Sequence, residues 1–256
     1  MIVFNSDLDN TLIYSYKHDI GKQKRCVEIY QNREVSFITE KTYELLRQVK
    51  ERVLFVPTTT RTIEQYERID LGVGIPEFAL VCNGGVLLKN GEEDKDWYNQ
   101  ALNLIADCRL ELSKAEKILK KDPNRSFEIR NIKDLFVFSK SDKPLESVKL
   151  LKDNLNIKLV DIFFNGFKVY VVPKKLSKGN AIKRFKEKVK ADYVIAAGDS
   201  EFDISMLNEA DIAIAPKILR NELHRREHTI ITEDNYLFSE ALLEVMISLS
   251  FYRHSL

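Results

Sequence analysis

Short apolar runs that end in polar residues are the feature of this sequence that most restricts its fold. Residues 1–4, 53–56 and 193–197 are each too short for a helix, and a continuous apolar run of this length is typical of a strand buried on both faces of a parallel sheet. Amphipathic segments alternate with these runs at both ends of the chain. This alternation predicts a doubly wound, mainly parallel α/β sheet.

Capping patterns indicate where the helices begin. Thr39 precedes a segment with apolar residues at helical spacing, and Thr62 followed by Gln65 has the form of a capping box. Ser200 and Asp203 repeat this pattern after the third apolar run. The sequence therefore predicts a helix after each of these threonine and serine residues.

The middle of the chain follows a different pattern. Arg61 and Lys178 lie 117 residues apart, whereas one parallel crossover unit takes only about 30 residues. Asn165-Gly166 separates two apolar runs, which is a strong hairpin signal, and residues 101–121 and 143–155 have helical patterns that each precede a pair of strands. The sequence thus predicts a core with an inserted α/β domain of helix-strand-strand units, with bounds of 1–87 and 173–256 for the core and 88–172 for the insert.

Composition excludes several classes of protein. The 256 residues are 44% hydrophobic and carry a formal net charge of +1, so the chain has neither the composition of a disordered protein nor the broad positive charge of nucleic-acid binders. Its three cysteines are scattered, which favours reduced thiols over a disulfide framework or a zinc site. No apolar stretch reaches the roughly 18 residues of a membrane span, and no signal peptide is recognisable. We expect a cytoplasmic protein with no nucleic-acid or membrane partner.

Two carboxylates directly after the first apolar run carry the sharpest chemical signal. Asp7 and Asp9, followed by Thr11, would lie at the carboxyl end of a strand, where open α/β sheets bind their ligands. Such a pair suits a metal ion, or a nucleophile with a neighbouring acid or base. An ordinary polar turn is the alternative. A calcium loop is excluded, because Leu12 stands where its glycine is required.

Polar residues also follow the other two runs. Residues 57–61 combine hydroxyl groups with a helix start, which suits an anion, although a threonine-rich turn has the same pattern. Lys178 stands at another predicted helix start, and residues 198–203 bring two further carboxylates after the third run. Each signal alone is weak. Together they form a set of residues that unrelated polar turns seldom assemble in one sheet.

The combination resembles the haloacid dehalogenase (HAD) superfamily of phosphatases. The matching motifs are Asp7-x-Asp9-x-Thr11, Thr59-x-Arg61, Lys178-Gly179 and Gly198-Asp199-Ser200-x-x-Asp203. The insert between the second and third motifs resembles the large α/β cap of the Cof-type and sucrose-phosphatase-like branch. Residues 6–15 and 57–62 are also similar to HAD proteins associated with bacterial stress and tellurium-resistance operons. Three positions depart from common family residues: Asn10, Thr60 and Phe202.

The resemblance implies a role for each matched residue. The catalytic residues would be Asp7, Asp9, Thr59 and Lys178. Asp7 would form an aspartyl-phosphate and Asp9 would protonate the leaving oxygen and later activate water, while the other two would hold the phosphoryl group. The ligands of Mg²⁺ would be Asp7, Asp9 through its backbone carbonyl, and Asp199, with Asp203 close by. The remaining polar residues would contact phosphate or substrate: Thr11, Thr60, Arg61, Asn83, Gly84 and Ser200.

The sequence therefore predicts a Mg²⁺-dependent phosphatase of a small phosphorylated metabolite, with a sugar phosphate as the expected ester. Phosphoryl transfer to another hydroxyl, as in a mutase, is one alternative, and a regulatory phosphate-binding protein without turnover is another. The presence of Asp7, Asp9, Lys178 and Asp199 argues against the latter. The insert would discriminate among leaving groups through polar residues such as Arg130, Lys140, Asn165, Lys168 and Tyr170.

Overall fold

A computed structural model describes residues 1–224, 226–233 and 237–252, and the chain forms two compact units. Unit 1 comprises Met1–Asp94 together with the chain from Lys178 onward, and unit 2 comprises Lys95–Ser177. The chain thus leaves unit 1 once and returns to it once. Each unit has its own sheet and its own buried core, and each is described separately below.

The central sheet of unit 1 is five-stranded and parallel throughout its described strands. Their order across the sheet is β15 (Thr229–Thr232), β14 (Ile212–Pro216), β13 (Tyr193–Ala197), β1 (Ile2–Ser6) and β5 (Leu54–Pro57). The three apolar runs of the sequence are the three adjacent strands β13, β1 and β5, and most of their residues are buried. The expected mainly parallel α/β core is confirmed.

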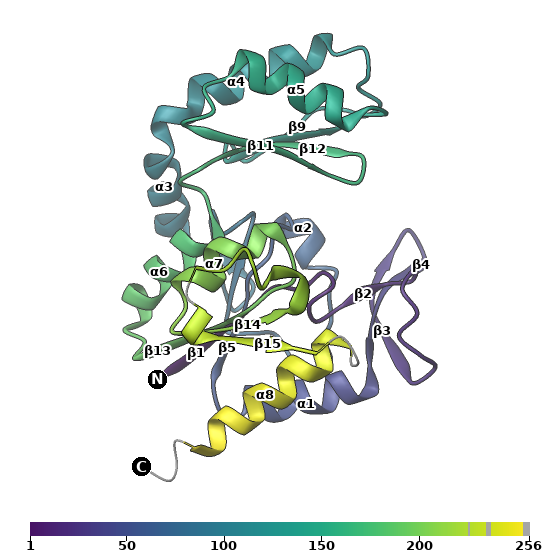
Figure 1. Cartoon of the computed structure of the whole chain (residues 1–256), viewed down its shortest axis with the longest axis vertical. Coiled ribbons are helices and arrows are strands. Elements are labelled where there is room, and N and C mark those ends of the chain that lie inside the picture. Colours follow the sequence, from purple (N-terminus) through teal and green to yellow (C-terminus); the bar gives the residue numbers. More distant parts are fainter. Residues whose placement is uncertain (225, 234–236, 253–256) are drawn as a thin grey trace. The chain divides into compact units, whose positions relative to one another are not determined.

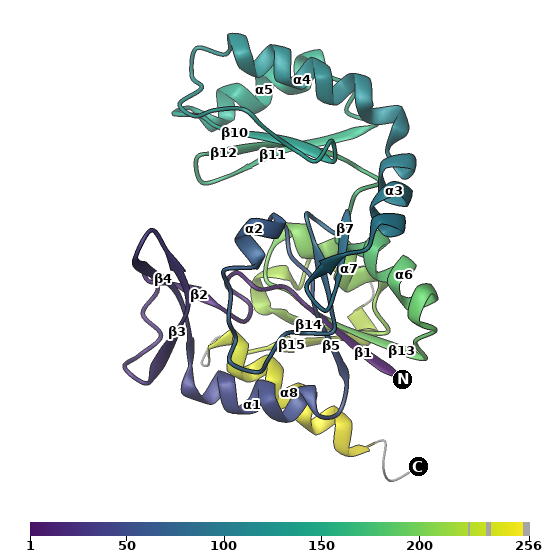
Figure 2. The ribbon, with the colours of Figure 1, turned by 180° about the vertical axis from the view of Figure 1, so that it is seen from behind.

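Helices cover both faces of this sheet (Figures 1 and 2). α1 (Glu40–Lys50) and α8 (Phe238–Tyr252) lie side by side on one face, where Leu46 and Leu242 pack with Phe4 of β1. α6 (Lys178–Val189) and α7 (Ile204–Glu209) lie on the other face. The hydroxyl of Thr39 caps α1 by accepting the backbone N–H of Thr42, as the capping pattern predicts.

Two small antiparallel sheets flank the central sheet of unit 1. The first has the order β2 (Tyr14–Ser15), β4 (Arg33–Thr39), β3 (Lys24–Tyr30), and the second has the order β6 (Phe78–Val81), β7 (Val86–Lys89), β8 (Glu92–Glu93). The sequence patterns did not predict the β3–β4 hairpin. The short helix α2 (Ile63–Tyr66) begins with the capping box of Thr62 and Gln65. The 3₁₀ turns of unit 1 are Glu201–Asp203, Lys217–Leu219 and Arg226–His228.

Unit 2 contains two helix-strand-strand repeats on one antiparallel sheet. After α3 (Lys95–Leu104) and a 3₁₀ turn (Ala106–Cys108), its elements are α4 (Arg109–Lys121), β9 (Arg130–Ile132), β10 (Phe136–Lys140), α5 (Pro144–Asn154), β11 (Val160–Asn165) and β12 (Lys168–Pro173). The sheet order is β11-β12-β10-β9. Val137 and Val171 point from the sheet toward Leu112 of α4 and Leu151 of α5, and these residues belong to one buried cluster. The predicted hairpin at Asn165-Gly166 joins β11 to β12.

Among the described helices, none combines the length and the apolar character that crossing a membrane requires. All three cysteines lie in the described part of the chain, and none of them is in a disulfide.

Candidate active site

Three adjacent parallel strands end at the same edge of the central sheet. Ser6, the last residue of β1, lies opposite Ala197 of β13 on one side and Pro57 of β5 on the other. Because the chain leaves all three strands at this edge, it brings together the motifs that begin at residues 7, 58 and 198. Strand pairing thus places motifs that are far apart in the sequence next to one another.

A buried ion-pair cluster lies directly beyond these strands. The ammonium group of Lys178, at the start of α6, donates to Asp7 Oδ1 and to Asp203 Oδ1, each over 2.6 Å. The side chain of Lys178 is 1% exposed, and those of Asp7 and Asp203 are 8% and 0% exposed. An ammonium paired with two carboxylates is the arrangement that makes a buried charge tolerable.

Asp203 organises the loop that follows β13. Its Oδ2 accepts the backbone N–H groups of Asp199 and Ser200 at 3.1 and 3.0 Å and the Ser200 hydroxyl at 2.9 Å. Gly198 allows this close approach, because a Cβ at that position would lie 2.4 Å from Cβ and Cγ of Asp203. Both oxygens of Asp203 therefore serve to hold Lys178 and the loop.

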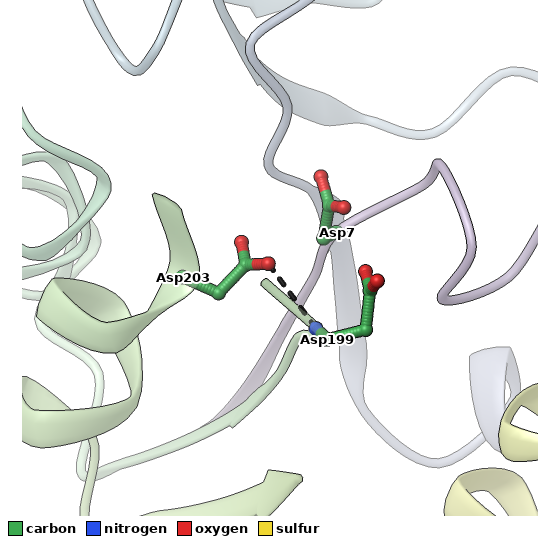
Figure 3. Close-up of side chains that lie close together, drawn as sticks. All are labelled: Asp7, Asp199 and Asp203. Carbon is green, nitrogen blue, oxygen red and sulfur yellow. Dashed lines mark hydrogen bonds between the residues drawn. The ribbon is translucent and has the colours of Figure 1, made fainter. Parts of the chain in front are cut away.

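Asp199 completes a group of three carboxylates. One oxygen from each of Asp7, Asp199 and Asp203 lies within 4.8 Å of the others, a spacing that could hold a metal ion (Figure 3). The hydroxyl of Thr11 donates to Asp199 Oδ1 at 2.8 Å and fixes this side chain. The site thus draws its carboxylates from the ends of β1 and β13.

Burial and the neighbouring charges together shift the pKa values of this cluster. Burial raises the pKa of Asp7 well above its usual range, and the charge of Asp203 adds to the shift while Lys178 opposes it. Burial, followed by the charge of Asp203, also raises the pKa of Asp199 to about 6. Burial would lower the pKa of Lys178, but the charges of Asp203 and Asp7 outweigh it and raise this pKa above its ordinary value. One ammonium therefore does not balance the three carboxylates, of which two are buried and Asp199 is half-buried.

Asp9 takes part in a different interaction. Its two side-chain oxygens accept hydrogen bonds of 2.7 Å from Nε and Nη2 of Arg61, which forms a bidentate pair. Nη1 of the same guanidinium lies 3.0 Å from Oε2 of Glu28, on the β3–β4 hairpin. Arg61, expected as a phosphate or substrate residue, is therefore engaged by two carboxylates.

The other expected phosphate residues lie in the loops after β5, β6 and β13. The backbone N–H of Thr59 donates to Leu80, and its hydroxyl accepts the backbone N–H of Arg61. Asn83 donates its backbone N–H to Thr59 at 3.0 Å, so the loop after β6 is joined to the loop after β5. Thr60 is a half-buried residue of the loop after β5, and Gly84 lies in the turn between β6 and β7. The hydroxyl of Ser200 is used within its own loop, by Asp203.

Asn10 shows how one departure from the family pattern is accommodated. Its backbone has φ of +58°, in the left-handed region that favours glycine. Asparagine is among the residues that tolerate this region best, so the turn after Asp9 keeps the required backbone without a glycine.

Glu28 is the site-proximal residue that the sequence motifs did not reveal. A single acidic residue inside the apolar segment Cys26-Val27-Glu28-Ile29-Tyr30 is the only local signal. Such a residue is compatible with an exposed strand face, so the pattern alone could not place it against Arg61.

The polar residues expected to discriminate substrates belong to unit 2. An aromatic row crosses its sheet through Phe138, Tyr170 and Phe163, with ring centroids 5.6 and 5.4 Å apart. Arg130 and Lys140 place their charged groups over the ring of Phe127, at 5.0 and 4.6 Å from its centroid. Asn165 and Lys168 pair at the turn between β11 and β12.

Comparisons with known proteins agree with this architecture. A family model described as haloacid dehalogenase-like hydrolase matches residues 92–235, more than half of the chain. A phosphoglycolate phosphatase from Sulfurisphaera tokodaii is 27% identical over 184 residues, which cover 70% of this chain and 72% of the relative. The family match begins after the first two motifs, so the placement of Asp7 and Arg61 rests on the geometry.

Two solved structures share the fold over nearly the whole chain. The sucrose-phosphatase from Synechocystis, solved with sucrose and phosphate, has a TM-score of 0.66 and 16% identity and covers 96% of this chain and 97% of its own. A trehalose-6-phosphate phosphatase related protein has a TM-score of 0.55 and 17% identity and covers 99% and 100% of the two chains. With its central parallel sheet, its aspartate and lysine cluster and this family match, the chain belongs to the haloacid dehalogenase-like hydrolase family and is a phosphatase of that family.

Proposed function

We propose that this phosphatase is Mg²⁺-dependent and hydrolyses a small polar phosphate monoester through an aspartyl-phosphate on Asp7. The single observation that carries the proposal is the group of Asp7, Asp199 and Asp203, which in the described part of the chain is paired with one ammonium, that of Lys178. A site of this charge is incomplete without a further cation, and it lies where the strands of an open α/β sheet present their ligands.

The donor set fits Mg²⁺. The metal-binding candidates are carboxylate oxygens, which Mg²⁺ prefers to nitrogen or sulfur. We assign the ion to Asp7, Asp199 and the backbone carbonyl of Asp9. Asp203 lies close by but is not assigned as a ligand of the ion, because its two oxygens already accept hydrogen bonds from Lys178 and from the loop after β13. When bound, the ion would neutralise charge on the phosphoryl group.

The chain's own residues would carry the covalent steps. A carboxylate oxygen of Asp7 attacks phosphorus, the bond from phosphorus to the ester oxygen breaks, and Asp9 gives that oxygen its proton. Water then attacks the aspartyl-phosphate, its proton passes to Asp9, and phosphate leaves with Asp7 restored. Lys178 and Thr59 would bind phosphoryl oxygens throughout, since such reactions depend chiefly on positioning and on charge neutralisation.

The expected substrate is a compact polar ester such as a sugar phosphate. Structures of similar fold include a sucrose-phosphatase, and a relative in sequence is named a phosphoglycolate phosphatase. These names define the two arms of the substrate test, which are sugar phosphates and phosphorylated hydroxy acids.

We further propose that unit 2 discriminates among leaving groups. Its cations and aromatic side chains suit a polar, hydroxyl-bearing molecule better than a lipid. Alanine substitutions at Arg130, Lys140, Asn165, Lys168 and Tyr170 test this. Those that contact substrate would lower kcat/KM for the best ester and spare a small generic ester. Equal losses on both, or none at any position, would contradict the proposal.

The deciding experiment is a hydrolysis screen over sugar phosphates, nucleotides, phosphoglycolate and phosphoglycerate. It is run with Mg²⁺, after chelation, and after Mg²⁺ is restored. We expect turnover that chelation abolishes and Mg²⁺ restores. Normal turnover by thoroughly metal-stripped protein would reject the metal dependence. Product analysis in the presence of added alcohols separates hydrolysis from phosphoryl transfer.

A further inference from the structure

The carboxylate proposed as acid and base is held by an ion-pair chain whose far member, Glu28, lies outside the catalytic motifs. Asp9 is paired with Arg61, and Arg61 is paired in turn with Glu28. The Asp9 side chain is 49% exposed, whereas the side chains of Arg61 and Glu28 are 13% and 3% exposed. The chain of charges thus runs from the half-exposed side chain of Asp9 to the buried side chain of Glu28 on the β3–β4 hairpin.

Glu28 is fixed from several directions. Its Oε2 accepts the hydroxyl of Ser36 at 2.6 Å and faces Arg61, while its Oε1 accepts Nε and Nη2 of Arg68 at 3.1 and 3.0 Å. Burial alone would raise the pKa of Glu28, but the hydrogen bonds from Arg61 and Ser36 outweigh it, so this pKa lies below its usual range. Glu28 is therefore a rigid, ionised anchor for the guanidinium of Arg61.

A distortion of the hairpin places Glu28 in this position. The register between β3 and β4 shifts on both sides of Glu28, and Val27 and Glu28 are buried consecutively, although neighbours on a regular strand point to opposite faces. Such a bulge redirects a side chain, and bulges are enriched next to active sites. A second contact, the backbone N–H of Asp70 donating to Val27 at 2.8 Å, holds the bulged strand.

The contribution of this buried ion-pair chain to the stability of the fold is a weak explanation for its presence. A buried carboxylate between two guanidinium groups loses much hydration, and apolar side chains of similar volume often stabilise a protein as well or better. What the arrangement does supply is a fixed guanidinium plane whose Nε and Nη2 groups each donate to one oxygen of Asp9. A planar fork of this kind defines both the position and the orientation of a carboxylate.

We propose that Glu28 is a positioning residue for the proton-transfer step, acting through Arg61 on Asp9. The inference rests on the proposed function, in which Asp9 gives a proton to the ester oxygen as the bond to phosphorus breaks. While both oxygens of Asp9 accept from Arg61, that carboxylate must exchange one contact to act as an acid. Glu28 keeps Arg61 in place during the exchange, so Asp9 returns to one defined position.

The leaving group provides a readout that a purely structural role would not move. A p-nitrophenolate departs readily without a proton, whereas an alkoxide requires an acid. We expect Glu28→Gln to lower kcat/KM by about tenfold for the alkyl phosphate hydrolysed fastest by the wild-type protein in the screen above, and by less than about twofold for p-nitrophenyl phosphate. The parameter kcat/KM covers the steps up to departure of the leaving group and excludes the later hydrolysis of the aspartyl-phosphate.

Glu34→Gln is the matched control. Glu34 lies on the same hairpin and loses the same charge on substitution, but its side chain is exposed. It should leave kcat/KM unchanged for both esters. If Glu28→Gln does not fold, as judged by circular dichroism, Arg61→Lys keeps the charge, removes the planar fork, and should show the same dependence on the leaving group.

Asp9→Asn separates failure of this inference from failure of the proposed function. Suppose that the loss of kcat/KM caused by Asp9→Asn depends on the leaving group, whereas Glu28→Gln lowers kcat/KM equally for both esters or for neither. The positioning role of Glu28 is then wrong, and the acid role of Asp9 stands. If Asp9→Asn shows no such dependence, the acid role is wrong and the inference falls with it.

Discussion

At the scale of single residues, the site is defined by an imbalance of charge. Buried Asp7 and Asp203 pair with Lys178, and half-buried Asp199 lies beside them. Burial, with the charge of Asp203 adding to it, raises the pKa of the carboxyl groups of Asp7 and Asp199, so the metal-free cluster favours protons. A divalent cation would compete with those protons, which links metal binding to pH.

The first prediction follows from Asp199, whose pKa burial and then the charge of Asp203 raise to about 6. Because the folded pKa lies above the ordinary value near 4, the metal-free fold gains stability from this group below about pH 4 and loses it as pH rises through 6. Mg²⁺ needs the ionised carboxylate, so its affinity should fall about tenfold per pH unit below 6.

Thermal denaturation checks this directly. Saturating Mg²⁺ should raise the Tm at pH 7.5 and have much less effect at pH 5. Asp199→Asn should reduce the shift at both values, whereas Asp161→Asn, an exposed aspartate of unit 2, should retain it. A Mg²⁺ shift of equal size at both pH values in the wild-type protein would contradict the assignment of Asp199.

The second prediction concerns the nucleophile. Asp7→Asn should lower kcat by about 10⁴-fold or more, because an amide does not attack phosphorus and binds a metal less well. The fold should persist, since Lys178 keeps its pair with Asp203. Circular dichroism and kcat measured on the same preparation test both parts. A folded variant with full activity would show that Asp7 is not the nucleophile.

At the scale of elements, the site depends on how closely one loop can approach another. The loop after β13 begins with Gly198 and is closed by the side chain of Asp203, which accepts two backbone N–H groups and one hydroxyl. Gly198 provides the space for that side chain. The position of Lys178, and through it that of Asp7, therefore depends on a residue without a side chain.

The third prediction tests this close approach. Gly198→Ala should destabilise the fold by about 1–3 kcal/mol, because its Cβ would lie 2.4 Å from Asp203 and the loop must move. It should also lower activity and the Mg²⁺-induced rise in Tm. Gly21→Ala is the control, since its Cβ would meet nothing within 4 Å and only its backbone, at φ +86°, is strained. Retention of full Mg²⁺ stabilisation in Gly198→Ala would contradict the argument.

At the scale of the whole molecule, the chain forms two units with separate cores. Unit 2 packs α4 and α5 on one antiparallel sheet through residues such as Leu112, Val171 and Leu151. All of these residues lie between Lys95 and Ser177, so the contacts of this core need nothing from unit 1. A segment with its own core and its own sheet meets the description of a domain.

The fourth prediction is that residues 95–177, produced alone, fold cooperatively. Circular dichroism should show mixed helix and strand content and a single thermal transition. Val171→Asp should abolish the transition, because Val171 is fully buried in the core of unit 2. Phe164→Asp is the control, since Phe164 is 41% exposed on the neighbouring strand. A fragment without any transition would mean that unit 2 requires unit 1.

Local patterns in the sequence determined the elements that carry the site. The apolar runs became β1, β5 and β13, and the hydroxyl caps at Thr39 and Thr62 begin α1 and α2. These signals depend on neighbours within a few residues, so they can be read without the fold. The motifs at Asp7 and Lys178 were recognised for the same reason, because each stands at the end or start of such an element.

How these elements meet depends on contacts between distant parts of the chain. The β3–β4 hairpin, the bulge at Glu28 and the pairing of Arg61 with Asp9 join positions 28, 61 and 9, and no local pattern encodes which distant charge a guanidinium will find. Likewise, Asp7 and Lys178 are 171 positions apart in the sequence, and they meet because the fold brings their elements together. Local sequence shows which chemical groups are available. The pairing of Arg61 with Asp9 and Glu28 depends on packing, because the free energy of a buried charge depends on every partner that reaches it.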